Sequence, residues 1–490
     1  VIALSAGPPA TPPQTRPPRD ASLEELTAWA EAIVQRSVVD TGSRVSVDSV
    51  TDRLDRAFTH PVLGVILFAL VMGALFYTLF TLAAVPMDLI EATFARLGDL
   101  ARTWLPEGPV RDLLTDGIVG GVAGTVVFLP QICLLFLLIS LLEDTGYVAR
   151  AAFVMDRLLY RFGLPGHAFV PLLTAHACAL PAIMSTRLIP DRRDRLATVL
   201  VAPFMSCSAR LPVYVLLTSL IFAGRPVLAA AAFVGCYLLG AAAALLSAVL
   251  FGRTILKGRA RPMVLELPTY KTPSLTNAVL TAKDQAISFL RSAGTVIMAI
   301  CIVMWWVSAY PKVGPTPEPE ALRARATVAG IAPAEAEALG AEADLLQSRA
   351  EQGGSFAGRI GQLMEPAFRP LGFDWQLTVG VLTSFLAREV FVSTMSVLAG
   401  GSGDADVDEG VVARIQGMMR ADGTPVFTTA RSAAALVFFV LAMQCLPTLA
   451  VTRRETGETK YALLQLGYMS ALAYVAALIV HQGLRAAGIS

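Results

Sequence analysis

The sequence predicts an all-α polytopic membrane protein with about 7–9 membrane helices, and three observations lead to this fold class. The 490 residues are 55% hydrophobic and only 16% charged, whereas soluble domains carry about 25% charged residues. Seven stretches are long and apolar enough for a spanning helix, which needs about 20 residues. The sequence lacks the regularly alternating short strands that a membrane barrel requires.

The N-terminal residues are expected to precede the membrane. Residues 1–20 form a proline-rich linker, because closely spaced prolines prevent a helix. Residues 21–57 are predicted to be a soluble helical segment. Ser22 can cap its first helix, with Glu25 three residues later completing a capping box.

Two membrane regions follow, at 58–310 and 375–490, and an extracytoplasmic loop is expected between them at 311–374. This long loop carries more acidic than basic residues. The seven candidate spans begin at His60, Gly117, Leu196, Val227, Ala293, Ala433 and Tyr461.

Basic residues predict the orientation, because Lys and Arg are enriched in cytoplasmic loops. Four Arg-rich and Lys-rich segments are therefore placed in the cytoplasm, together with the N-terminus. These segments are residues 150–163, 187–195, 252–262 and 452–460.

Two further apolar stretches do not look like simple spans. Residues 168–186 have Arg-rich segments on both sides and contain Pro181, so they are predicted to enter the membrane from the cytoplasm and return. Residues 375–400 carry Arg388 and Glu389 between two loops expected outside. Two broken elements that enter from opposite sides indicate an inverted repeat with a site between its halves. Either stretch could instead cross the membrane.

The two halves of this repeat are expected to act as two gate regions. The first covers about residues 125–220. The second covers about residues 290–400 and includes the loop between the membrane regions.

Glu389 is the strongest candidate functional residue. A carboxylate in the middle of a membrane segment costs about 2.5 kcal/mol or more unless it is paired or hydrated. It therefore marks either an ion path or a structural ion pair with an arginine. Arg388 is a poor partner, since adjacent helical residues do not face each other.

Cys178 and Cys207 are candidate metal ligands because each lies close to prolines and polar residues. Prolines free backbone carbonyls, and His176 lies two residues before Cys178. Thiolate and imidazole suit divalent transition metals. The alternative is that these cysteines are small apolar residues, which is the interpretation preferred for Cys133, Cys236 and Cys301. Glu143 ends a span and is either an interfacial cap or a ligand.

Several classes of function are not supported by the sequence. The sequence contains no CxxC pair, which argues against a zinc ribbon or disulfide framework. It contains no G-x-x-x-x-G-K-[ST] loop, so no nucleotide site and no enzymatic activity are expected for this chain. The net charge of +1 and the lack of a basic aromatic stripe give no indication of nucleic-acid binding.

Six segments closely resemble the bacterial ferrous iron transport protein B (FeoB) family, and the likeness extends from about residue 50 to about 482. They are residues 128–159, 181–187, 193–217, 265–275, 289–306 and 385–398. The resemblance implies transport of Fe2+ across the bacterial inner membrane through two gate regions. It places the family's gate residues at Cys178, Cys207 and Glu389.

The chain also departs from the family pattern. Around the first cysteine the family has Gly-x-Gly-Cys-Asn-Val-Pro, whereas residues 175–181 read AHACALP. His176 is therefore a candidate substitute ligand. The family commonly has Pro-Cys where this chain has Gln444-Cys445, which adds Cys445 as a weaker candidate.

The family's N-terminal GTPase domain has no counterpart in the sequence. The resemblance therefore implies either a piece of a longer protein or a separate nucleotide-binding partner, and a homo-oligomer is also compatible with it. Two other functions stay open: a carrier of another divalent metal or of a nucleoside, and a membrane scaffold or sensor without flux.

Overall fold

The computed structural model describes residues 49–490 apart from 61, 107, 258–269, 313, 315, 328–332, 386–387, 389, 400–408, 421 and 490. The chain divides into two compact units, Val1–Phe58 and Thr59–Ser490. In the first unit the described residues form one helix, α2 (Ser49–Phe58). The predicted linker and most of the predicted helical segment 21–57 lie outside the described residues.

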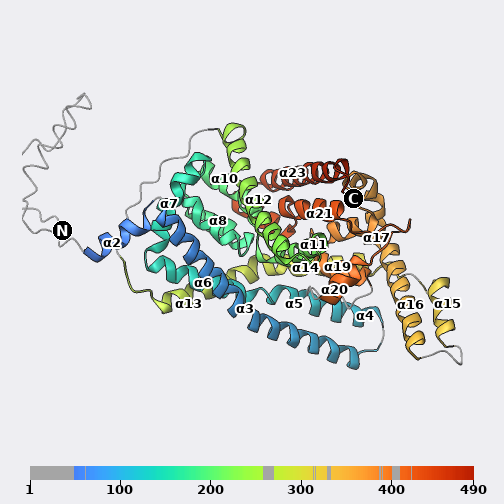
Figure 1. Ribbon diagram of the computed structural model, residues 1–490. Coiled ribbons are helices and arrows are strands. Elements are labelled where there is room, and N and C mark those ends of the chain that lie inside the picture. Colours follow the sequence, from blue (N-terminus) through green and yellow to red (C-terminus); the bar gives the residue numbers. More distant parts are fainter. Residues whose placement is uncertain are drawn as a thin grey trace, which may run out of the picture. The chain divides into compact units, whose positions relative to one another are not determined.

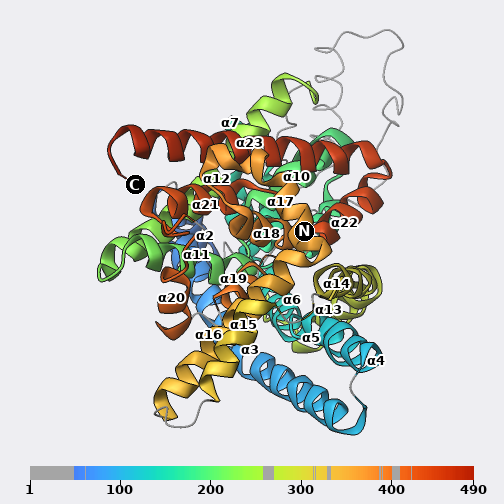
Figure 2. The same cartoon turned by 90° about the vertical axis from the view of Figure 1, so that its right-hand side faces the viewer.

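The second unit is helical, as the apolar runs of the sequence predict (Figures 1 and 2). Over the described residues, its one β-type contact is an isolated bridge between Met419 and Pro425. Among the described residues, six helical segments are long and apolar enough to cross a membrane, and they coincide with six of the seven predicted spans. They are Leu63–Trp104, Pro109–Asp144, Arg192–Ile221, Pro226–Arg253, Thr429–Thr456 and Thr459–Ala486.

Three of these segments are single helices, and the other three are interrupted. The single helices are α3 (Leu63–Trp104), α12 (Pro226–Arg253) and α23 (Thr459–Ala486). The first interrupted segment consists of α4 (Pro109–Asp112), the π-helix η1 (Leu113–Val119), α5 (Gly120–Val126) and α6 (Leu129–Asp144). The other two are α10 (Arg192–Val201) with α11 (Leu211–Ile221), and α21 (Thr429–Leu441) with α22 (Leu446–Thr456).

The seventh predicted span is built from α13 (Leu275–Phe289), the π-helix η6 (Leu290–Gly294) and α14 (Thr295–Ala309). At one end the Ser274 amide donates to Asp144 at 3.0 Å. At the other end Lys312 donates to Asp112 at 2.8 Å. α6 packs on α13, and α5 packs on α14. The segment 275–309 therefore runs antiparallel to Pro109–Asp144 and extends along its whole length.

The order of elements occurs twice along the second unit. In the first half, two short helices that pack on each other, α8 (Phe169–Ala175) and α9 (Ala179–Ser185), precede the interrupted pair α10–α11 and the single helix α12. In the second half, α18 (Trp375–Thr383) and α19 (Val390–Leu398) pack on each other and precede α21–α22 and α23. The halves interlock, because α9 packs on α22 while α19 packs on α11.

The ends of these helices gather in two places, which we call the Arg-rich end and the Lys312 end. At the Arg-rich end, Arg187 contacts Glu455 and Arg193 donates to the Leu256 carbonyl at 2.6 Å. At the Lys312 end, the Phe356 amide donates to the Tyr310 carbonyl at 2.8 Å. The α8–α9 pair is flanked by the first end, and the α18–α19 pair by the second. The two halves therefore have opposite orientations, as the predicted inverted repeat requires.

The segment expected as an extracytoplasmic loop is mostly helical. It contains α15 (Pro317–Ala326), α16 (Pro333–Gly354) and α17 (Phe356–Phe368). Acidic residues in the first turn and basic residues in the last turn favour α15 through the helix dipole. The remaining α-helices are α7 (Tyr147–Arg161) and α20 (Glu409–Gln416). In Figure 1, α15 and α16 lie at the side of the second unit opposite α7 and α8.

Candidate functional site

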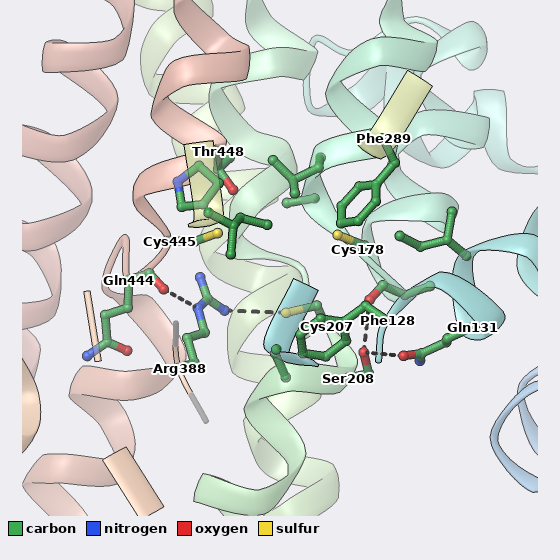
Figure 3. Close-up of a pocket in the computed structure, with 18 of the residues that line it drawn as sticks. Phe128, Gln131, Cys178, Cys207, Ser208, Phe289, Arg388, Gln444, Cys445 and Thr448 are labelled. Atoms are coloured by element: carbon green, nitrogen blue, oxygen red, sulfur yellow. Dashed lines mark hydrogen bonds between the residues drawn. The ribbon is translucent and has the colours of Figure 1, made fainter. Parts of the chain in front are cut away.

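A cavity of about 280 Å³ lies between the two halves, where the helix breaks meet (Figure 3). Residues from α5, α6, α9 and α14 line it together with residues of the breaks that precede α11, α19 and α22. Most of its lining is apolar, and the polar groups come mainly from the breaks. Four cysteines contribute to it: Cys178, Cys207, Cys301 and Cys445.

Cys178 stands at the break between α8 and α9. Its backbone is extended, with φ −155° and ψ 134°, and it occupies the position immediately before α9. The amides of Ala177 and Cys178 still donate to the Thr174 carbonyl, at 3.0 and 3.1 Å. Pro181 lies in the first turn of α9, where its missing N–H is tolerated. The break therefore turns the Cys178 thiol into the cavity at a helix N-terminus.

Cys207 stands at the break between α10 and α11. Two short 3₁₀ turns, η4 (Ala202–Phe204) and η5 (Ser208–Arg210), replace the regular helix here, and Cys207 lies between them. Arg210 is fully buried and donates to the carbonyls of Pro203 and Phe204, both at 3.0 Å. Carbonyls freed inside a membrane protein need such partners, so Arg210 stabilises the break structurally.

Cys445 stands at the break between α21 and α22, and the geometry resembles that at Cys178. Its backbone is extended, with φ −162° and ψ 92°, and Pro447 follows in the first turn of α22. The Leu446 amide donates to the Phe385 carbonyl at 3.0 Å. Three of the four cavity cysteines thus directly precede a helix or a helical turn.

Arg388 brings a positive charge into the same cavity. It is 4% exposed, its Nε donates to the Gln444 carbonyl at 3.1 Å, and its Nη1 lies 3.7 Å from the Cys207 sulfur. Figure 3 shows its guanidinium group between Cys445 and Cys207. On the opposite wall, Ser208 donates to the Ala177 carbonyl at 3.1 Å and contacts Gln131 at 3.3 Å.

This arrangement offers sulfur ligands from three separate helix breaks. Among the described residues, however, no group of three His, Cys, Asp or Glu side chains is placed to hold one metal ion. The cysteines are thus placed singly along the cavity wall, each at its own position in the fold.

The remaining predicted site residues lie elsewhere. His176 packs between the rings of Phe76 and Tyr237, at centroid distances of 6.1 and 6.3 Å, and its Nδ1 lies 3.1 Å from the Leu172 carbonyl. It is not among the residues that line the cavity. Glu143 is exposed near the end of α6 and does not line the cavity either.

Glu389 lies outside the described residues, although both of its neighbours, Arg388 and Val390, line the cavity. Sequence reasoning did not assign Gln131 or Thr448 to the site, and it considered Arg388 only as a partner for Glu389. Thr448 could have been identified from the sequence because it directly follows Pro447, the proline of a helix break. Gln131 gave a similar signal, because it follows Pro130 at the start of α6.

The second unit resembles known sequence families. The sequence model of the Gate family, described as "Nucleoside recognition", matches residues 125–220 and 290–459. A second model, described as "Ferrous iron transport protein B C terminus", matches residues 233–284. Both matches fall within the membrane region, and the first covers both broken elements.

Curated relatives carry names of the same kind. The Fe(2+) transporter FeoB of Leptospira interrogans is 39% identical over 468 residues, which are 94% of this chain and 63% of that protein. The corresponding protein of Leptospira biflexa is 40% identical over 88% of this chain and 59% of its own length. A Porphyromonas gingivalis protein named as a fusion of Fe(2+) transport protein A and FeoB is 38% identical over 89% of this chain and 51% of its own length.

The chain therefore spans less than two thirds of the length of these relatives. No solved structure matches it.

Proposed function

Since the chain belongs to the FeoB family, we propose that it carries ferrous iron across the bacterial inner membrane through the cavity between its two halves. The observation that carries this proposal is the convergence of Cys178, Cys207 and Cys445 on one cavity from three helix breaks. Fe2+ accepts such ligands, and separate thiols along a path allow the ion to be released.

Glu389 is proposed as a further ligand because both of its neighbours line the cavity. Arg388 would oppose a divalent cation at Cys207, since two charges attract or repel strongly at such a distance in a protein interior. A carboxylate next in sequence would offset this positive charge. His176 is proposed to orient α8 against α12 rather than to bind iron, because its ring packs on Tyr237 of α12.

A nucleotide-dependent partner is part of the proposal. The first unit, which ends at Phe58, is proposed to connect the membrane unit to a GTPase domain or to a separate GTPase. The Porphyromonas gingivalis relative is named as a fusion with Fe(2+) transport protein A, so a small protein of that kind is a second candidate partner. The N-terminus and the Arg-rich end are proposed to be cytoplasmic.

Anaerobic uptake of Fe2+ into proteoliposomes tests this function. We expect saturable uptake that rises when a GTPase partner and GTP are added, while the purified chain alone hydrolyses no GTP. Mn2+, Zn2+ and a nucleoside serve as competitors. If the nucleoside competes and the divalent metals do not, the cavity would instead be assigned to a nucleoside, in line with the description of the Gate family. GTP-stimulated, saturable Fe2+ uptake excludes a scaffold without flux.

A further inference from the structure

Two helices lead from the cavity to the Arg-rich end, one from each half. α9 begins directly after Cys178 and α22 begins directly after Cys445, and the two helices pack side by side. α9 has seven residues and α22 has eleven, so at about 1.5 Å per residue they extend about 10 and about 16 Å beyond the cavity cysteines. The line along which α9 and α22 pack therefore connects the cavity cysteines with the Arg-rich end.

One buried carboxylate joins the far ends of these helices. Glu455, in the last turn of α22, has a side chain that is only 3% exposed. Arg187, just after α9, donates from Nε to its Oε2 at 2.7 Å and contacts Oε1 through Nη2. Arg195 of α10 contacts the Glu455 Oε2 at 3.3 Å and donates to its backbone carbonyl at 2.8 Å. We call these three residues the Glu455 cluster.

Burial and geometry make the Glu455 cluster stronger than an ordinary surface pair. Exposed pairs contribute about 0–1 kcal/mol, whereas a bidentate arginine–carboxylate contact is shorter, stronger and directional. Both carboxylate oxygens of Glu455 are engaged, and both arginines come from the other half of the repeat. The two halves cannot separate at this end without hydrating or re-pairing a carboxylate that is now buried.

We propose that the Glu455 cluster is a lock that holds the Arg-rich end of the cavity closed. To open this end, the Arg187–Glu455 contact would break first, and α9 would then separate from α22. This proposal rests on the proposed transport function. It adds named residues that control access to the cavity from one side.

The chain supplies a matched control three residues later. Glu458 lies at the same end and contacts Arg192 at 3.0 Å and Lys460 at 2.5 Å, but its side chain is 36% exposed. Glu458→Gln removes one negative charge at the Arg-rich end, as Glu455→Gln does. It removes exposed pairs and leaves the Glu455 cluster intact.

Thiol labelling tests the lock without any need for iron flux. The purified full chain is reconstituted in vesicles, and a membrane-impermeant maleimide is added on the side of the Arg-rich end or on the other side. Mass spectrometry then gives the labelling rate of Cys178 and Cys445. We expect Glu455→Gln to raise both labelling rates about fivefold or more, and only when the maleimide is added on the side of the Arg-rich end. A fivefold rise corresponds to a loss of roughly 1 kcal/mol in the free energy that favours the closed state. Glu458→Gln should label like the wild type.

Arg187→Gln keeps the test decisive if Glu455→Gln does not fold. The Arg187 side chain is 53% exposed, and its removal leaves the buried Glu455 carboxylate paired with Arg195 at 3.3 Å. This variant should therefore raise the same labelling rates by a smaller factor. Unchanged rates in the folded lock variants would overturn the lock. Equal increases in the labelling rates from both sides, together with faster labelling of Cys236, which does not line the cavity, would also overturn the lock, because they indicate general loosening of the fold. A chain that labels as expected but carries no Fe2+ would refute the transport function and leave the lock standing.

Discussion

Single residues at the helix breaks decide which groups face the cavity. Cys178 and Cys445 share an extended backbone directly before a helix and a proline in the first turn that follows. Cys207 has the same place before η5. Cys236, in contrast, is buried within the regular helix α12 and does not line the cavity. Position relative to a break, rather than the presence of a thiol, thus separates candidate ligands from packing residues.

Cysteine replacements test this distinction at the residue scale. We expect Cys178→Ser, Cys207→Ser and Cys445→Ser each to lower Fe2+ uptake by about tenfold or more, because the hydroxyl is a poorer ligand for a soft divalent metal. Expression and melting temperature should change little. Cys236→Ser is the matched control and should retain uptake. Similar small effects at all four positions would mean that the thiols only fill space.

The sequence made part of this site predictable and concealed the rest. Prolines near Cys178 and Cys207 signalled broken helices that expose polar groups, and the structure places both cysteines in one cavity. His176 does not line this cavity, and its ring packs against Phe76 and Tyr237. Contacts between halves, such as Arg388 with Cys207, depend on residues 181 positions apart and could not be read from local pattern.

At the scale of elements, the uninterrupted helix α12 supports the break that carries Cys207. Gly240 of α12 lies against η4, and a Cβ atom added to it would come 2.7 Å from the Phe204 carbonyl oxygen. Backbone cannot yield as a flexible side chain can. The glycine therefore permits the close approach that fixes the course of residues 202–207.

Substitution of Gly240 tests this support. Gly240→Ala should destabilise the protein by about 1–3 kcal/mol, as overpacking does, and should lower Fe2+ uptake because Cys207 follows the displaced turn. Gly235→Ala in the same helix is the control, since no atom lies within 4 Å of its added Cβ. Thermal unfolding and uptake would be measured on the same preparations. Equal stability of the two variants would show that η4 adjusts freely.

Other elements were less predictable from sequence. The apolar spans were visible because each satisfies the length and composition that a bilayer imposes. The segment 311–374 carries no such constraint, and its helices α15, α16 and α17 depend on packing with each other and with α18. Charge and composition predict a segment outside the membrane here, but they do not indicate that it contains helices.

For the whole molecule, the two halves have opposite orientations, and this follows from which ends meet. Arg187 and Glu455 meet at the Arg-rich end. His481 and Gln482 of α23 lie at the Lys312 end, 3.1 and 3.0 Å from the Pro370 carbonyl. What the sequence could not give is the number of crossings, because the segment 275–309 has no single helix of spanning length.

The number of crossings has a direct test at the two ends of the molecule. In the part of the chain that the structure describes, six segments qualify as spans by length and composition. Six crossings would put the start of α3 and the end of α23 on the same side of the membrane. If α13, η6 and α14 together form a seventh crossing, those two positions lie on opposite sides. Lys257 lies on the same side as the start of α3, because four of these segments separate the two positions. We expect an epitope inserted after Lys257 to be protected in intact cells, and an epitope inserted after Ala487 to be accessible from outside. Protection of both epitopes in intact cells, with exposure of both after lysis, would contradict the seventh crossing and with it the opposite orientation of the two halves.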